Sequence, residues 1–516
     1  MTAYQWFVFF LIMQVVHFLG TWKLYESAGR KRWEAAIPVY NAIVLMKIIN
    51  RPTWWTVLLF IPIINLIMFP VIWVETLRSF GKKSSLDTFL GIVTFGFYIY
   101  YVNYTQKLDY IADRSLQPEN KTADTISSLL FAVIVATLVH TYFIQPYTIP
   151  TSSLEKSLLI GDFLFVSKMN YGARVPMTTV ALPMVHDSIP LTKSKSYLTW
   201  PQLPYLRLPG IQNINRTDIV VFNWPVDTVY KFFDTSKRRA YKPVDKKSNY
   251  VKRCVGIPGD SLSIKDGIVY INGKILQLPE RAKPQFSYAV ALDGKTSIDF
   301  ESLLKELDIT DDAGFKNDLR DTLFLKALTA AGAERLKNVP GVVSVTRQIS
   351  KGIEGGIFPH INKWNRDNFG PIYIPQKGKT VSLTTETLPF YRMIISEYEK
   401  KDLKVNGSEI RIDGKVVNSY TFDQNYYWMM GDNRHNSEDS RYWGYVPEDH
   451  IVGKPIFIWL SIDPHGKGIN KIRWDRVFTT VSGEGQPQSY FKLFLLALVA
   501  FFVGEYFWKK RKAKKD

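Results

Sequence analysis

The sequence predicts a mainly β core that carries a helical insertion and is anchored by several membrane-spanning α-helices. Apolar segments of roughly membrane-crossing length lie at both ends of the chain, whereas the middle is polar. The polar middle contains short apolar or alternating runs bounded by turn dipeptides, which are typical of strands. Between residues 279 and 404 some apolar residues recur with a helical period of about 3.6. This insertion divides the predicted β core into residues 145–278 and 405–482.

Composition narrows the class of protein. The 516 residues carry a net charge of +18, and the basic clusters flank apolar segments, which is typical of membrane proteins rather than of nucleic-acid binding. The single cysteine, Cys254, excludes an intrachain disulfide and a cysteine-rich metal site. We expect it to be a small buried side chain, because a nucleophilic thiol needs an activating partner. The histidines lack metal-ligand spacing, so neither a metal nor a cofactor is predicted.

Five apolar segments are candidates for membrane spans. A helix needs roughly 20 residues to cross about 30 Å of hydrocarbon, and each segment is near that length. The first lies where a signal peptide would, but it has no preceding basic region and no convincing cleavage site, so we interpret it as a retained anchor. The candidate segments are residues 6–20, 54–74, 89–102, 126–144 and 491–507.

Basic residues predict how these spans are oriented. The tail 509–516 is strongly basic and marks the cytoplasmic side, so one span at 490–508 places the polar middle on the outer face. The basic loop 29–32 is also expected inside. The N-terminus is then outside, and residues 1–105 form a multi-span block with three crossings.

One conflict leaves the path of the N-terminal block open. With three full crossings, Arg78, Lys82 and Lys83 lie outside, against the positive-inside rule. Two alternatives remain: a half-span at residues 36–49, or a re-entrant segment around the prolines of the second apolar stretch.

The polar middle is predicted to contain strands and, in its insertion, helices. Residues 218–222 form a short apolar run, and residues 261–271 alternate before an Asn-Gly turn. Residues 409–417 alternate around an Asp-Gly pair, which is a hairpin signal. Apolar spacing predicts helices over 302–307 and 317–336, within the insertion.

The stretch 149–172 places a serine directly after an apolar span. Ser153 stands in a cluster of hydroxyl residues, and Gly161-Asp162 leads into a strand-like run at 163–166. A serine close to a bilayer indicates chemistry at a membrane surface. A nucleophilic serine needs a base, and this stretch contains no histidine.

Two later stretches carry polar residues in suggestive patterns. Lys252 and Arg253 are neighbours on a predicted strand, so their side chains point to opposite faces. One of the two is then buried and the other exposed, or both are exposed on an edge strand that resists aggregation. Residues 431–444 are densely polar, which predicts an ordered hydrogen-bond network, with an exposed turn as the alternative.

Together these stretches resemble the bacterial type I signal peptidases. The serine motif of that family is matched by residues 149–154 with Gly161 and Asp162, and the lysine motif by residues 250–260. The last motif is matched by residues 431–447. The order of the motifs and the span before the serine also agree, and the resemblance implies a β fold of the signal-peptidase and LexA type.

Four positions depart from the usual pattern of the family. Thr151 replaces a serine and keeps the hydroxyl, and Leu154 replaces a methionine and keeps apolar bulk. Lys156 stands near the usual proline, and His435 replaces a common aspartate. The chemistry is expected to survive, with the effects concentrated in substrate preference and local geometry.

The resemblance assigns catalytic roles. It implies that Ser153 attacks a peptide carbonyl, that Lys252 is the general base, and that Ser437 orients this lysine. The backbone N–H of Ser153 and the hydroxyl of Thr151 would form the oxyanion hole. A lysine in water has a pKa of about 10.4, and burial among apolar groups lowers it.

The remaining motif residues are expected to support the site. The resemblance implies a supporting ion pair between Asp439 and Arg441. It makes the other matched residues structural: Gly161, Asp162, Arg253, Gly431, Asp432, Asn433 and Arg434.

The implied function is the removal of signal peptides from exported preproteins. Such peptides end in an A-x-A-like site of small residues, and cleavage would occur at the outer face of a bacterial inner membrane. The implied partners are secretory preproteins and the lipid bilayer, with the export machinery as a further candidate and no nucleic acid. The aromatic segment 197–208 either enters the membrane interface or packs conventionally.

Two other classes of function remain as alternatives. The chain could be a catalytically inactive membrane scaffold, but the joint presence of Ser153, Lys252 and Ser437 counts against this. It could be a self-cleaving regulator with the same serine and lysine, but no DNA-binding motif precedes the core.

Overall fold

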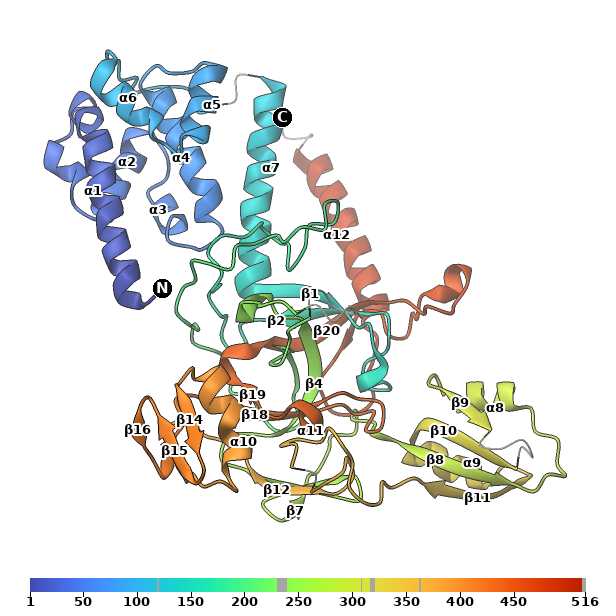
Figure 1. Ribbon diagram of the computed structural model, residues 1–516. Coiled ribbons are helices and arrows are strands. Elements are labelled where there is room, and N and C mark those ends of the chain that lie inside the picture. Colours follow the sequence, from blue (N-terminus) through green and yellow to red (C-terminus); the bar gives the residue numbers. More distant parts are fainter. Residues whose placement is uncertain (118–119, 230–238, 308, 316–320, 362, 513–516) are drawn as a thin grey trace. The chain divides into compact units, whose positions relative to one another are not determined.

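The computed structural model describes residues 1–117, 120–229, 239–307, 309–315, 321–361 and 363–512 (Figure 1). The chain forms two compact units. The first comprises Met1–Phe143, Ala173–Leu208 and Thr228–Lys247, and the second Ile144–Gly172, Pro209–Asp227 and Ser248–Asp516. Two segments of the predicted β core therefore belong to the N-terminal unit.

The first unit is helical. Its helix α1 begins with a capping box, in which Thr2 and Gln5 each bond the backbone of the other. Within the described residues three helices of the chain are long and apolar enough to cross a membrane, namely Ala3–Ser27, Lys121–Phe143 and Phe491–Lys512. The α-helices of this unit are α1 (Ala3–Ser27), α2 (Tyr40–Ile48), α3 (Trp55–Leu58), α4 (Asn65–Ser79), α5 (Ser85–Val93), α6 (Tyr98–Thr105) and α7 (Lys121–Leu138).

The predicted span at 54–74 is not a continuous helix. The chain forms the short helix α3, bends, and starts α4 at Asn65. Pro62 has no backbone N–H, and Ile63 has a φ of 71°, so the helical hydrogen-bond pattern stops there.

The predicted span at 89–102 is also broken. Its two helices, α5 and α6, are inclined at 119°, and the chain reverses at Phe95 and Gly96, which both have positive φ. Lys82 Nζ, before α5, donates to Gln106 Oε1, after α6, at 3.2 Å. The chain therefore enters and leaves this helix pair at the same end.

A sheet of eight strands forms the centre of the second unit. Its order is β1-β2-β20-β3-β4-β18-β19, with β21 paired to β20. All five residues of β3 are buried, because Val221 packs on one side of the sheet and Val220 on the other. The strands are β1 (Ile144–Thr148), β2 (Asp162–Ser167), β3 (Ile219–Asn223), β4 (Asn249–Gly256), β18 (Tyr426–Met430), β19 (Val446–Pro447), β20 (Ile451–Ser461) and β21 (Thr479–Thr480).

Smaller sheets surround this centre. The predicted strand 261–271 is in fact two strands, because Asp266 and Gly267 adopt positive φ and turn the chain between β5 and β6. The predicted hairpin at 409–417 is confirmed as β15 and β16. These sheets comprise β12 (Phe369–Tyr373), β5 (Ser261–Lys265), β6 (Ile268–Ile271) and β7 (Lys274–Ile275); β14 (Leu403–Asn406), β15 (Glu409–Ile412) and β16 (Lys415–Val416); and β13 (Thr380–Ser382) with β17 (Ser419–Thr421).

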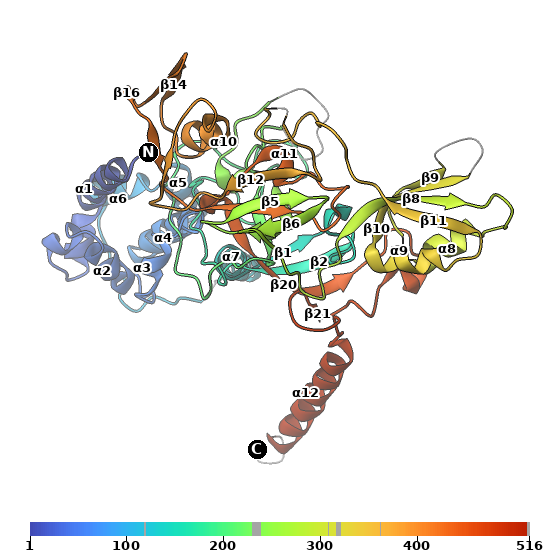
Figure 2. The same cartoon turned by 90° about the horizontal axis from the view of Figure 1, so that it is seen from below.

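The first part of the insertion is a mixed α/β subdomain (Figure 2). Four strands in the order β11-β8-β10-β9 pack against two helices in one apolar cluster. Within the second unit, α10 (Leu388–Met393), α11 (Ser440–Trp443) and the C-terminal α12 (Phe491–Lys512) complete the α-helices described. The subdomain comprises β8 (Gln285–Leu292), α8 (Phe300–Glu306), β9 (Ala313–Phe315), β10 (Thr322–Thr329), α9 (Ala330–Lys337) and β11 (Val342–Arg347).

The predicted helical character of this insertion is only partly correct. The helix expected at 302–307 is present as α8. The helix expected at 317–336 is wrong over residues 322–329, which form β10 and pair with β8, while residues 316–320 lie outside the described chain. Thr329 caps a helix that starts only at Ala330. Pairing in the sheet therefore overrides the local helical pattern.

Candidate active site

Ser153 and Lys252 meet inside the second unit. Ser153 lies in a short 3₁₀ turn, Ser152–Leu154, that follows β1, and Lys252 lies on β4. Lys252 Nζ is 2.7 Å from Ser153 Oγ, and the two residues are 3% and 7% exposed. Burial lowers the pKa of Lys252 to about 8, although the charges of Asp439 and Glu438 act to raise it. A substantial fraction of the amine is therefore neutral near physiological pH and can accept a proton.

The position of β4 explains why this lysine is buried. β4 lies between β3 and β18, so both edges of the strand are paired within the sheet. Lys252 and Arg253 are each 3% exposed. The expectation that at least one of them is exposed is therefore wrong, because β4 is a central strand and not an edge strand.

Arg253 forms a buried ion pair with Asp432. Arg253 Nε donates to Asp432 Oδ1 at 2.8 Å, and Nη2 donates to Oδ2 at 2.6 Å. Ser157 Oγ, in the loop after the serine turn, donates to Asp432 Oδ2 at 2.6 Å. This pair links β4, the serine loop and residues 431–444, which we call the polar loop.

A second buried ion pair lies within the polar loop itself. Arg441 Nε and Nη2 donate to the two carboxylate oxygens of Asp439, both at 2.8 Å. Gly431 N–H also donates to Asp439 Oδ2, at 3.0 Å, and Arg441 Nη2 donates to the carbonyl of Arg434 at 2.6 Å. The polar loop is an ordered network, as its composition predicts, and the exposed-turn alternative is wrong.

Glycine at 431 allows the polar loop to approach the serine turn. A Cβ atom at this position would lie 2.5 Å from the Ser153 carbonyl oxygen and 2.3 Å from Ser437 Oγ. The loop also contacts the turn directly, because the Asn433 N–H donates to the Ser153 carbonyl at 3.1 Å.

Two hydroxyls expected at the site make no hydrogen bond to Ser153 or Lys252 among the described residues. Ser437 is 8% exposed, and its Oγ makes no hydrogen bond to Lys252; its hydroxyl faces the Asp439 carboxylate and helps to lower the pKa of that group. Thr151 is half-buried and extended, and no bond from its side chain to the described residues occurs. Thr151 is near Ser153 because it stands two residues before it in the chain. Ser437 is near Ser153 because the polar loop packs on the serine turn.

Gly161 and Asp162 fix the other end of the serine loop. Gly161 has a φ of +86°, and a Cβ there would lie 1.9 Å from the carbonyl oxygen of Ile462, so only glycine fits. The buried Asp162 carboxylate accepts bonds from Ser461 Oγ at 2.7 Å and Arg476 Nη2 at 2.5 Å. The first contact holds the loop against the end of β20, and the second holds it against the segment before β21.

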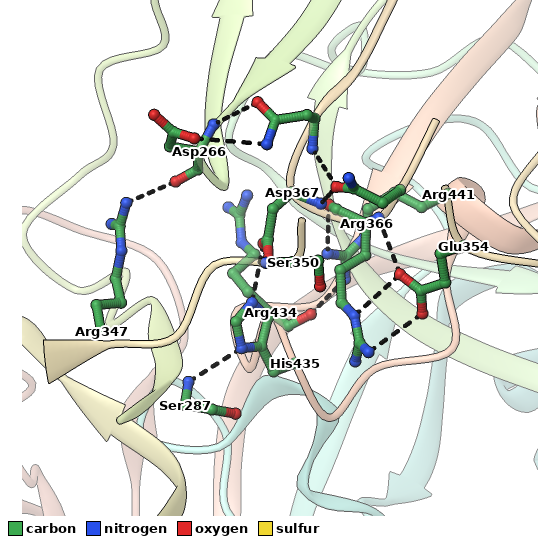
Figure 3. A network of polar contacts seen from close by, with 12 residues as sticks. Asp266, Ser287, Arg347, Ser350, Glu354, Arg366, Asp367, Arg434, His435 and Arg441 are labelled. Carbon is green, nitrogen blue, oxygen red and sulfur yellow. Dashed lines mark hydrogen bonds and ion pairs between the residues drawn. The ribbon is translucent and has the colours of Figure 1, made fainter. Parts of the chain in front are cut away.

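His435 joins the polar loop to the insertion and to the segment before β12 (Figure 3). The Ser287 N–H donates to His435 Nδ1 at 3.1 Å, so Nε2 carries the proton and donates to Asp367 Oδ1 at 2.9 Å. Asp367 Oδ2 accepts from the Ser350 N–H at 2.7 Å. The network therefore contacts the subdomain where the chain enters it, at β8, and where the chain leaves it, just after β11.

Several of these contacts were invisible in the sequence. Asp367 and Ser157 contact the polar loop, but neither residue belongs to a recognisable sequence motif. Cys254 is fully buried, as expected, and burial raises the pKa of its thiol. Among the described residues, no group of three or more histidine, cysteine or acidic side chains could hold a metal ion.

Comparison with known proteins places the chain in a family. Residues 122–316 and 375–460, more than half of the chain, match the family described as signal peptidase, peptidase S26. Residues 33–113 match a family of unknown function, DUF5684.

Similar curated proteins agree with this match. The signal peptidase I of Haemophilus influenzae is 24% identical over 380 residues, which cover 71% of this chain and 78% of that protein. The signal peptidase I of Buchnera aphidicola subsp. Acyrthosiphon pisum is 24% identical over 370 residues, covering 69% and 82%. That of Rickettsia canadensis is 29% identical over 168 residues, covering 33% and 50%. Ser153, after β1, and Lys252, on β4, therefore lie together in a chain that belongs to the signal peptidase family, peptidase S26.

Proposed function

We propose that this protein is a membrane-bound signal peptidase I that removes N-terminal signal peptides from exported preproteins. The observation that supports this most is the 2.7 Å contact between Lys252 Nζ and Ser153 Oγ, in a buried site that lowers the pKa of the lysine to about 8. The family match and the signal peptidase I relatives support the same reaction.

The proposed reaction proceeds through an acyl-enzyme. Ser153 Oγ attacks the carbonyl carbon of the scissile bond while its proton passes to Lys252 Nζ. The Ser153 N–H and the Thr151 hydroxyl stabilise the oxyanion. Lys252 then returns the proton to the leaving amine. A water molecule, deprotonated by the neutral lysine, releases the signal peptide from Ser153.

The supporting residues have separate proposed roles. Ser437 has a buried hydroxyl whose hydrogen faces the Asp439 carboxylate, so its oxygen can accept, and we assign it the hydrogen bond from the Lys252 ammonium formed during the reaction. The ion pair of Asp439 with Arg441 holds the polar loop in place. The pair of Arg253 with Asp432 ties this loop to β4.

The substrate proposal follows from the location of the site. A signal peptide leaves its apolar segment in the bilayer and presents small residues of an A-x-A type at the outer surface. An extended peptide can add to the edge of a β structure and be read through alternate side chains. Ser153 follows the apolar helix Lys121–Phe143 by only ten residues of sequence, which supports a site at the membrane surface.

Contacts within the first unit support an orientation with the N-terminus outside. At one end of the unit, the Trp6 Nε1–H donates to the Gln202 carbonyl at 2.9 Å, and Ile63 clusters with Ala181 and Tyr197. These partners belong to Ala173–Leu208, which follows the outer strand β2. The start of α1 and the start of α4 therefore face the proposed outer side.

The basic residues gather at the opposite end of the unit. Ser27 Oγ donates to the Leu108 carbonyl at 3.3 Å, and the Ile111 N–H donates to the Ser79 carbonyl at 2.9 Å, so the ends of α1 and α4 lie together. With α5 and α6 as a re-entrant pair, Arg78, Lys82 and Lys83 stay on the inner side. The proposed topology thus satisfies the positive-inside rule that three full crossings violate.

The segment 197–208 divides between the two expected roles. Tyr197 is buried beside Ile63, which is conventional packing. Leu198, Trp200 and Leu206 are 57–69% exposed, and we propose that these side chains enter the outer membrane interface.

Cleavage of a secretory preprotein by the full-length detergent-solubilised protein tests the proposed function. Wild type should cut after a small residue at the signal-peptide boundary, and Ser153→Ala and Lys252→Ala should each lose this activity. Cleavage that persists in one purified variant removes that residue from the mechanism. A folded wild type that cuts none of several preproteins favours the membrane-scaffold alternative.

A further inference from the structure

Asp311 belongs to the insertion, yet its carboxylate contacts the polar loop of the site. It lies between α8 and β9. Asn433 Nδ2 donates to Asp311 Oδ2 at 2.5 Å, and Asn436 Nδ2 donates to Asp311 Oδ1 at 3.1 Å. Each oxygen of the carboxylate therefore holds a different asparagine of the loop.

The same two amides reach the residue before the serine nucleophile. Asn433 Nδ2 donates to the Ser152 carbonyl at 3.2 Å, and Asn436 Nδ2 donates to Ser152 Oγ at 2.9 Å. An amide nitrogen carries two hydrogens, so each asparagine gives one to Asp311 and the other to Ser152. A carboxylate only accepts hydrogen bonds. It therefore fixes which end of each amide faces the serine turn.

Neighbouring contacts hold the insertion at this place. Thr310 Oγ1 donates to Glu155 Oε1 at 3.0 Å, and Gln285 Nε2 donates to the Glu155 carbonyl at 3.0 Å. The backbone of Gln285 donates to the Asp432 carbonyl and accepts from the Arg434 N–H, both at 2.9 Å. Two separate segments of the insertion thus bind the serine turn and the polar loop together.

We propose that Asp311 is a positioning residue for Ser153. It orients the amides of Asn433 and Asn436, and these hold the backbone and side chain of Ser152. The backbone N–H of Asn433 also donates to the Ser153 carbonyl, so the turn is held at both Ser152 and Ser153. The inference rests on the proposed role of Ser153 as the nucleophile. It makes the insertion part of the catalytic unit rather than an appended domain.

The test compares Asp311→Ala with Asp312→Ala in the full-length protein on one preprotein. Asp312 is a matched control, because it loses the same charge at the next position, where its side chain is 90% exposed and pairs only loosely with Lys326 at 3.3 Å. Asp311→Ala should lower kcat about tenfold with KM unchanged, since a misplaced reactive group costs rate and not substrate binding. Asp312→Ala should match wild type. Asp311→Glu should recover part of the loss, and Asp311→Asn should be intermediate because its amide oxygen still accepts one bond.

A double-mutant cycle separates positioning from a general effect on stability. In the Asn436→Ala background, the Asp311→Ala change should cost clearly less in kcat than in wild type, because part of its route to Ser152 is gone. Equal costs in both backgrounds would overturn the proposal. A kcat equal to that of Asp312→Ala, or a change confined to KM, would also overturn it while leaving the proposed function intact. Failure of wild type to cleave any preprotein would overturn both, since there would be no nucleophile to position.

Discussion

Replacing Lys252 with methionine should abolish cleavage and yet stabilise the fold at neutral pH. Methionine keeps the length and apolar stem of the side chain but cannot accept the proton of Ser153. In the folded protein the lysine is 3% exposed, and burial disfavours its charged form. Burial of this lysine therefore lowers the free energy of unfolding at any pH at which the lysine is protonated in the unfolded chain.

The size and pH range of this effect follow from the pKa. The difference between the ordinary value of 10.5 and about 8 corresponds to roughly 3 kcal/mol, at about 1.36 kcal/mol per pH unit. Below about pH 8 the unfolded and folded chains both bind the proton, so the full cost is present. Between about pH 8 and 10.5 only the unfolded chain remains protonated, and the cost declines with rising pH. Above about pH 10.5 it is gone.

The assay is the thermal unfolding midpoint of detergent-solubilised protein, measured for wild type and Lys252→Met from about pH 7 to 10.5. The midpoint of the variant should be higher at pH 7, and the difference should shrink as the pH rises. Lys274→Met, at an exposed lysine of β7, is the control and should change neither cleavage nor stability. A variant that is less stable than wild type at pH 7, or a difference that does not vary with pH, would refute the reasoning.

Three further outcomes are expected. The cleavage rate should rise from about pH 6 and level off above about pH 8, because only the neutral lysine accepts the serine proton; a flat profile would contradict this base. Asp432→Asn should destabilise the protein by about 3–5 kcal/mol in denaturant unfolding, because it leaves the Arg253 charge buried and unpaired. Unchanged stability would show that the ion pair contributes little. Gly161→Ala should reduce stability or folded yield far more than Gly273→Ala, since both have positive φ but only Gly161 faces a backbone oxygen at 1.9 Å from the new Cβ. Equal losses in the two variants would mean that the positive φ, and not the contact with the backbone oxygen, causes the loss of stability.

The sequence allowed prediction of the candidate site residues that the structure brings together, because they lie within short motifs. The serine turn, the β4 lysine and the polar loop each carry their chemistry within a few consecutive residues, so local pattern is sufficient. The contacts of Asp311 and Asp367 could not be predicted. These carboxylates are 122 and 68 residues from Asn433 and His435, and no spacing rule connects them.

The fold was predictable where one physical effect dominates. The strand expected at 218–222 is present as β3, because a run of apolar residues fits a strand buried on both faces. Residues 322–329 were expected to be helical because apolar residues recur there at a helical spacing, but pairing with β8 makes them a strand. The break at 59–64 and the reversal at Phe95 depend on single backbone dihedrals, which hydropathy does not report.

The ion pairs around Lys252 explain how a lysine near several carboxylates can still have a lowered pKa. A free carboxylate beside it would hold it as an ammonium and prevent it from acting as a base. Although burial alone would raise the pKa of both carboxyls, the guanidinium of Arg253 holds that of Asp432 below its usual range, and Arg441 does the same for Asp439. Every oxygen of these two carboxylates accepts a bond from its arginine. Arginine suits this task because its guanidinium stays charged when buried and binds both carboxylate oxygens at once, whereas a lysine ammonium is a single point charge whose pKa shifts readily on burial. The arginines therefore neutralise Asp432 and Asp439. The charge of Glu438 still acts to raise the pKa of Lys252, but burial outweighs it and lowers that pKa.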